Sequence, residues 1–428
     1  MRATTAAPAR ASRTPSRTRI ELHEWVLAAL AFVMPLGPGT KPAFLGSSTL
    51  TLGFAALAAY LLWSLVLLSG GRLPRHARSL LVPLVLYVVV TGAASLRFHL
   101  PGVRYEMFAL MALAVAAYLI CERHRPGSWL RITYRASVAG LVLAVVEGHR
   151  TVADTGVNRL TGTNSAIFLG FQASLVLIVA YMHVRGTGGR GRLWPLLAMA
   201  LGAYVLVESF SRTALISTAL AAAVIFFFSG RQSRLVRGLV LAAMLLVVML
   251  VAVPVVIRYL GANHSETVFE ASGRVNIWPR LLHHDTEPWA GYGFGTLHDS
   301  LGPDQRLLYL NGGLQSENAA LQAFLMGGFL AAALWLWVAV RVLRSLWSVR
   351  SRAGGVALGV AVVIALNAMA SSALSGIAVD FWWLLAAASL ADGVRARRRA
   401  GAAALHPPKE RVRQPAREPV YRRSRLPI

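Results

Sequence analysis

Apolar runs long enough to cross a membrane follow one another along nearly all of this 428-residue chain. A helix of about 20 apolar residues spans the hydrocarbon core of a bilayer. Because no water is available there, a spanning segment has to satisfy its own backbone hydrogen bonds, which a helix does. The composition agrees, since 56% of the residues are hydrophobic and only 14% are charged, whereas soluble domains carry about a quarter charged residues. The sequence therefore predicts an all-α polytopic membrane protein.

The apolar runs divide into about twelve predicted transmembrane helices of the length that a bilayer requires. The first is interrupted by Pro35, Gly37 and Pro38, and the seventh and eighth are joined by a very short link. The predicted spans are 24–38, 47–69, 79–96, 105–121, 132–148, 164–184, 193–209, 212–229, 235–257, 319–343, 355–375 and 378–394.

The formal net charge of +25 is distributed as a topology signal. Arginines cluster in the links after the even-numbered spans and in both termini, and this excess marks the cytoplasmic side of a membrane protein. The pattern predicts that both termini are cytoplasmic and that the connection 258–318, between spans 9 and 10, is one large extracytoplasmic loop. It also argues against a nucleic-acid partner. The arginines in the links are Arg72, Arg75, Arg78, Arg123, Arg125, Arg131, Arg185, Arg190, Arg192, Arg231, Arg234, Arg237, Arg341, Arg344, Arg350 and Arg352.

The two ends of the chain differ from the apolar body. Residues 1–20 are basic and contain no acidic residue, which predicts a disordered cytoplasmic leader, with a transit peptide as the alternative. Residues 396–428 are predicted to form a disordered basic tail, because several prolines oppose a helix there. The body, 21–395, is then one membrane domain. Its single cysteine, Cys121, excludes an intrachain disulfide and a cysteine-based metal cluster.

The outer loop carries glycines and histidines that need interpretation. Its run GYGFG, Gly291–Gly295 with Gly293 at the centre, permits a tight turn or a close approach of backbone amides to a ligand. The histidines His283, His284 and His298 match no zinc-ligand spacing. We therefore expect neither a metal nor another cofactor.

Arginines on the predicted outer side run against the charge bias and are candidates for binding an anion. A guanidinium grips phosphate oxygens with two parallel hydrogen bonds and keeps its charge at any relevant pH. For two of them a structural alternative stays open, namely a pair with Glu208 for Arg212 and a solvated loop charge near Asp154 for Arg159. Arg97 and Arg104 could instead anchor their helices at the membrane interface. The outward arginines are Arg97, Arg104, Arg150, Arg159, Arg212 and Arg274.

Glu317 stands where the outer loop meets the tenth predicted span, with Ser316 or Asn318 as a possible helix cap. An acidic residue in a first turn stabilises the helix dipole. The alternative is that Glu317 is a general base at the mouth of a cavity in the membrane.

Five motifs in this order resemble the O-antigen ligase and polymerase family, membrane glycosyltransferases that use polyprenyl-diphosphate-linked glycans. The likeness extends over about residues 20–395 and includes the twelve-span layout. The motifs are RLTGTNS at 159–165, SFSRTAL at 209–215, SGRVNIW at 272–278, GYGFGT at 291–296 and QSENAALQAFLMGGFL at 315–330.

The resemblance implies an inverting, metal-independent glycosyl transfer from the lipid-linked donor to a lipid or glycan acceptor, outside the inner membrane of a bacterium. The family's arginines fall on Arg159, Arg212 and Arg274, which would bind the diphosphate. Lipopolysaccharide ligases commonly carry His-Asn where this chain has Glu317-Asn318, so the base would be a carboxylate, with His298 as a substitute. Gly293 and Arg104 complete the expected substrate-binding set.

Two other classes remain as alternatives. A secondary transporter of a small anionic solute would also have about twelve spans, and Asn367 and Asp380 are the intramembrane polar residues in its favour. A non-catalytic scaffold for envelope assembly is the other. The absence of a long internal repeat and the large outer loop argue against a transporter.

Overall fold

The structure of the protein is a computed structural model, and it describes most of the predicted helices. The predicted span 235–257, most of the predicted spans 24–38 and 47–69, and nearly all of the outer loop lie outside the described residues. The described residues are 22, 24–27, 59–60, 73–97, 103–152, 158–161, 166–186, 189–228, 289–291, 318–350, 355–370 and 379–405.

The described helices coincide with predicted spans, which confirms an all-α membrane architecture. Four of them are long and apolar enough to cross a bilayer, namely α3, α5, α6 and α14. α7, α8 and α15 are shorter apolar helices. The elements are α3 (Arg75–Arg97), α4 (Val103–His124), α5 (Ser128–Glu147), β1 (Arg150–Val152), β2 (Asn158–Leu160), α6 (Ala166–Gly186), η1 (Gly189–Arg192), α7 (Leu193–Glu208), α8 (Arg212–Phe228), α14 (Ala319–Val349), α15 (Val356–Ala370) and α16 (Val379–Leu405).

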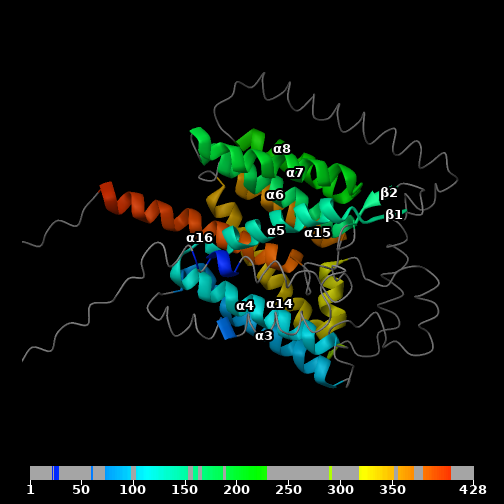
Figure 1. Cartoon of the computed structure of the whole chain (residues 1–428). Helices are drawn as coiled ribbons and strands as arrows, with labels where there is room; N and C mark the ends of the chain where they lie inside the picture. The colour runs from blue at the N-terminus through cyan, green and yellow to red at the C-terminus, as the bar shows by residue number, and fades with distance from the viewer. Residues whose placement is uncertain are drawn as a thin grey trace, which may run out of the picture.

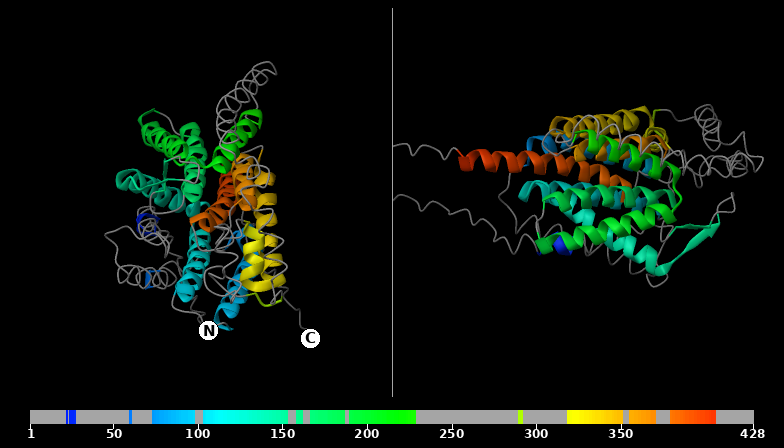
Figure 2. Two further views of the ribbon diagram at one scale, coloured as in Figure 1. Left: turned by 90° about the vertical axis from the view of Figure 1, so that its right-hand side faces the viewer. Right: turned by 90° about the horizontal axis from the view of Figure 1, so that it is seen from above.

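The helices form two groups with α16 between them (Figure 1). α6 packs against α7 and α8, α8 packs against α15, and α3 packs against α4 and α14. α16 contacts α5 on one side and α14 on the other. Viewed along and across the bundle, the helices run roughly parallel or antiparallel to one another (Figure 2).

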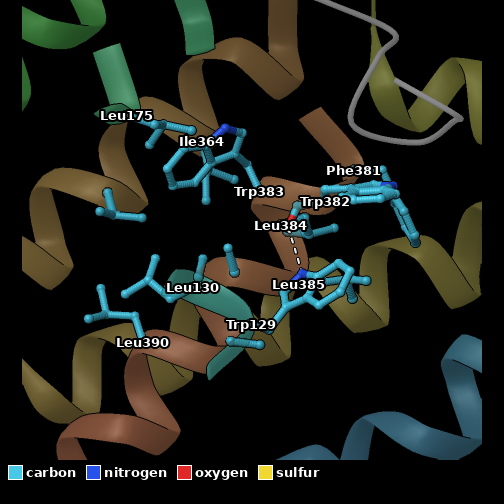
Figure 3. Close-up of a cluster of buried hydrophobic side chains, with 14 of the residues drawn as sticks. Trp129, Leu130, Leu175, Ile364, Phe381, Trp382, Trp383, Leu384, Leu385 and Leu390 are labelled. Atoms are coloured by element: carbon cyan, nitrogen blue, oxygen red, sulfur yellow. Dashed lines mark hydrogen bonds between the residues drawn. The ribbon is translucent and has the colours of Figure 1, made fainter. Parts of the chain in front are cut away.

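The best-buried part of the core surrounds α16. Trp382, Trp383 and Leu385 of this helix are almost fully buried. The Trp382 ring lies 5.2 Å from the ring of Trp129 of α5, centroid to centroid, and the indole Nε1 of Trp129 donates to the Trp382 carbonyl oxygen at 3.2 Å (Figure 3). A tryptophan buried at membrane depth needs such a partner for its N–H. The contact therefore fixes α5 and α16 in register.

α16 continues to Leu405, past residue 395 where the predicted tail begins. The segment RARRRAGAAA that follows the apolar part is rich in arginine and alanine, which favour a helix. The prolines that oppose a helix begin only at Pro407. In Figure 1 the end of α16 projects beyond the other helices.

A small β-hairpin interrupts the otherwise helical architecture between α5 and α6. β1 and β2 pair antiparallel, with Arg150 opposite Leu160 and Thr151 opposite Arg159. The sequence did not predict this hairpin, because strands of three residues are too short to show a period-two pattern.

Candidate functional site

The hairpin and the α7–α8 junction lie together at the end of the bundle that the charge pattern assigns to the outside. The Arg150 guanidinium NH2 group bonds the Glu208 carboxylate at the end of α7 at 2.6 Å. Arg159 stands in β2, beside this pair, and is half-buried. The hairpin thus holds one predicted site arginine against the end of α7.

The Glu208 carboxylate forms an ion pair with Arg150, whereas the alternative left open for Arg212 was a helical pair with Glu208. Geometry explains the difference, because α7 ends at Glu208 and α8 begins only at Arg212. The two residues are therefore not neighbours on one helix face, as the i,i+4 spacing would require.

The turn between α7 and α8 places Arg212 at the first position of α8. Phe210 in this turn has φ 45°, a left-handed conformation that a phenylalanine rarely adopts. Ser209 and Ser211 on either side of it are buried. They sit on Gly170 of α6, where a Cβ would lie 2.6 Å from the Ser211 Cβ. The turn is therefore fixed by close packing against α6, and with it the start of α8.

Asn318 begins α14 as its N-cap. Its backbone is extended (φ −145°, ψ 124°), as is usual for an N-cap residue. Its side chain also acts as a cap, because Oδ1 accepts hydrogen bonds from the amides of Ala320 and Leu321 at 3.0 and 3.1 Å. The first turn of α14 contains no acidic residue. Glu317 therefore precedes the cap in the chain, which removes the interpretation that it supports the dipole from inside the first turn.

The remaining predicted residues are only partly placed. Arg104 belongs to the first turn of α4, without a described side chain. Glu317, Arg274, Gly293 and His298 lie outside the described residues. In the described part of the chain, no group of three or more His, Cys, Asp and Glu side chains could hold a metal ion.

Asn367, which the sequence offered as a transporter feature, takes part in helix packing. Its Nδ2 donates to the Ser217 hydroxyl of α8 at 3.3 Å and to the Val363 carbonyl oxygen at 2.8 Å. Its Oδ1 has no hydrogen-bond partner among the described residues. The amide therefore joins α15, near its end, to α8, near its start.

Sequence reasoning missed three of these features, namely the Arg150–Glu208 ion pair, the strained Phe210 and the packing role of Gly170. Arg150 and Glu208 are 58 residues apart, and no local pattern connects them. The only available signal was the SFSRTAL motif, whose two serines flank a phenylalanine at a helix junction.

The Arg150–Glu208 ion pair should contribute little to stability. Both side chains are partly exposed, at 38% and 26%, and such pairs contribute roughly 0–1 kcal/mol. We expect Glu208→Gln to lower the free energy of unfolding by less than about 1 kcal/mol, measured by thermal unfolding in detergent. A loss several times larger would show that the hairpin depends on this contact to fold.

These features define a class: a polytopic α-helical membrane protein whose helix bundle carries arginines on short, well-fixed turns at one end. Residues 197–336 match the family of O-antigen ligases. The match confirms the resemblance to the O-antigen ligase and polymerase family over about a third of the chain, and it identifies a bacterial membrane protein. The matched segment includes Arg212 and the sequence positions of Arg274, Gly293, His298, Glu317 and Asn318. No curated protein matches the sequence.

Proposed function

We propose that the protein transfers a glycan from a polyprenyl-diphosphate carrier to an acceptor hydroxyl at the extracytoplasmic face of the membrane. The observation that carries this proposal is the O-antigen ligase match, which includes Arg212 at the start of α8. Arg159 lies on the hairpin that packs against the end of α7, next to this helix start. Two guanidinium groups from different elements at one end of a bundle suit a diphosphate.

The proposed reaction is a displacement at the anomeric carbon of the donor sugar. The acceptor oxygen forms the new glycosidic bond while the bond to the diphosphate oxygen breaks, with inversion and without a metal. Arg159, Arg212 and Arg274 would stabilise the negative charge that develops on the leaving diphosphate. Glu317 would take the proton of the acceptor hydroxyl. Asn318, Gly293, Arg104 and His298 complete the proposed substrate-binding set.

The proposed topology follows the arginine pattern. About twelve spans form a membrane domain that begins near residue 21, both termini are cytoplasmic and the loop 258–318 faces outward. The orientation of the described helices is consistent with it, because Arg212 and Asn318 begin helices while Arg123 and Arg185 lie in last turns. In a bacterium this corresponds to the inner membrane.

Replacing the proposed base should separate transfer from donor binding. Glu317→Gln keeps the size and polarity of the side chain but removes its ability to accept a proton at neutral pH. We expect turnover to fall by about 100-fold or more, since general base catalysis contributes roughly 10²–10⁴-fold. Binding of the lipid-linked donor, measured with donor extracted from cells that lack the protein, should stay within a factor of about three.

His298→Gln serves as the matched control for Glu317→Gln, since His298 is the substitute base. Normal turnover in Glu317→Gln together with its loss in His298→Gln would move the proposed base to His298. Normal turnover in both variants would remove proton abstraction by either residue from the mechanism.

The surface glycan of a deletion strain distinguishes polymerase from ligase. If the protein is a polymerase, its deletion should leave single unpolymerised units on the surface. If it is a ligase, its deletion should leave long chains attached to the lipid carrier. Unchanged surface glycan with an altered uptake of a small anion would instead indicate the transporter. Gel electrophoresis of the surface and lipid-linked fractions separates the polymerase outcome from the ligase outcome, and an uptake assay in the same strain detects the transporter.

A further inference from the structure

α14 is broken inside the bundle without a proline. Gly327 (φ −152°, ψ 26°) and Gly328 (φ 66°, ψ −165°) depart from helical geometry and divide it into a first half, 319–326, and a longer second half. Only glycine adopts the conformation of Gly328 without strain. In Figure 1 the first half stands across the bundle at the end that also carries the hairpin. The direction of the first half, and so the place of Asn318, is decided at this break.

A short turn from the outer loop packs directly on the break. We call Trp289, Ala290 and Gly291 the 289–291 turn. Gly291 is buried with φ 64°, and a Cβ on it would lie 2.4 Å from the Gly327 nitrogen and 2.6 Å from the Gly328 nitrogen. Those atoms are backbone and cannot move aside as a side chain can. The backbone of the turn therefore lies against the backbone of the break.

α3 closes the other side of the break. A Cβ on Gly327 would meet the Ala331 Cβ at 2.6 Å, the Val90 Cγ1 at 3.2 Å and the Thr91 Cγ2 at 3.3 Å. The break is thus enclosed between α3 and the 289–291 turn. A non-helical backbone at membrane depth is tolerated where protein covers it.

Three aromatic rings connect the turn to both halves of α14. The Phe329 ring, in the second half, lies 5.4 Å from the Trp289 ring and 4.9 Å from the Phe324 ring of the first half, centroid to centroid. Aromatic pairs at these distances stabilise their geometry beyond simple burial. Phe329 therefore touches the turn on one side and the first half of α14 on the other.

We infer, on the basis of the proposed function, that the 289–291 turn and the Gly327–Gly328 break form a positioning device for glycosyl transfer. The turn fixes the angle of the first half of α14, and that half carries the Asn318 cap next to the proposed base. Gly291, Gly327, Trp289 and Phe329 are then positioning residues, which act through the start of α14 and not by touching the substrate.

Gly291→Ala is the sharpest test, with Gly189→Ala as its matched control. Both glycines have positive φ, 64° and 54°, but a Cβ on Gly189 would meet nothing within 4 Å. A difference between the Gly291→Ala and Gly189→Ala proteins therefore reports the contact with the break, because the backbone strain of alanine at positive φ is present in both. We expect amide hydrogen exchange in 319–326 to accelerate at least tenfold in Gly291→Ala and to stay unchanged in Gly189→Ala. Surface glycan should fall about tenfold or more only in Gly291→Ala, at equal amounts of protein in the membrane.

Variants at the exposed rings keep the inference testable if Gly291→Ala does not fold. Trp289 is 79% exposed and Phe329 is 53% exposed, so their truncation should leave the fold intact. We expect Trp289→Ala and Phe329→Ala each to lower the maximal turnover about fivefold with little change in KM for the donor. The double variant should lose no more than either single one, and Trp289→Phe should restore most of the turnover.

The exchange measurement needs no substrate, so its result is independent of the transferase activity. Equal exchange of 319–326 in the Gly291→Ala and Gly189→Ala proteins would overturn the positioning device, as would normal surface glycan in Gly291→Ala cells. Additive losses in the double ring variant would do the same. Intact glycan in Arg212→Ala cells would overturn the proposed function, and the positioning role with it, while the exchange difference would persist.

Discussion

Arg212→Ala should lower glycosyl transfer by about 100-fold or more, since removing one preorganised group that stabilises charge in a transition state costs roughly 10²–10³ in rate. Arg212 stands at the first position of α8, directly after the packed turn at Phe210. A guanidinium held there does not have to be ordered at the moment of reaction. Turnover of the lipid-linked donor in purified protein measures this loss.

Arg212→Lys separates charge from shape in the same assay. Lysine keeps the positive charge but not the planar fork, so we expect it to recover only part of the activity. Arg192→Ala is the control, because Arg192 is an exposed arginine at the opposite end of α7 from the junction with α8. We expect it to retain wild-type turnover.

The pair Arg159→Ala and Arg212→Ala tests whether the two residues hold the same group. If both bind one diphosphate, the double variant should be only slightly worse than either single variant, since residues that act as a unit are not additive. Wild-type surface glycan in Arg212→Ala cells with normal protein levels would contradict the diphosphate site.

Glu122→Ala should be the most destabilising single change at the end of the bundle that the charge pattern assigns to the cytoplasm. Glu122 is fully buried at the end of α4, and its carboxylate accepts from the amides of Gly127, at 3.0 Å, and Trp129, at 3.3 Å. It also accepts from the Ser389 hydroxyl of α16, which in turn accepts from the Leu130 amide. One carboxylate therefore caps α5, whose own N-cap residue is a glycine, and ties it to α16.

The expected loss follows from the donors that Glu122→Ala leaves buried. Each unsatisfied buried donor costs about 1–3 kcal/mol, so we expect a loss of roughly 3 kcal/mol or more. The melting temperature in detergent should drop by on the order of 5 °C. Glu122→Gln keeps one acceptor oxygen, so its melting temperature should lie between those of the unchanged protein and Glu122→Ala.

Glu147→Ala is the matched control for Glu122→Ala, at the other end of α5. Its Oε2 is buried without a hydrogen-bond partner among the described residues, so its removal strands no donor. We expect its melting temperature to stay close to that of the unchanged protein. If the Glu122→Ala protein also melted at the temperature of the unchanged protein, the capping role of Glu122 would be wrong.

Helix positions were predictable from the sequence because apolar length is a local property. The segment 193–209 predicted α7 (Leu193–Glu208), and 212–229 predicted α8 (Arg212–Phe228), each to within a residue. The end of α16 was predicted ten residues too early, at 395 instead of Leu405. The reason is that charge marks the edge of a membrane span but does not end a helix.

The candidate site was predictable in its residue types and only partly in its arrangement. The sequence offered Asn318 as a possible cap of α14, and the structure confirms it. The sequence left open a helical pair between Glu208 and Arg212, but α7 ends at Glu208, α8 begins at Arg212, and Arg150 of the hairpin bonds Glu208. A contact between residues that are far apart in the sequence produces no repeating pattern from which it could be predicted.

The sequence by itself determined the membrane class, the positions of the described helices and the candidate arginines, since the length and polarity of each segment are read against the thickness of a bilayer. Only the tertiary structure decided that α14 is broken at Gly327–Gly328 and that Gly291 lies on this break. The physical reason is steric. A glycine pair in an apolar helix is compatible with a continuous helix. Whether the helix breaks at the pair depends on its tertiary neighbours, because another stretch of backbone that packs very close leaves no space for a Cβ.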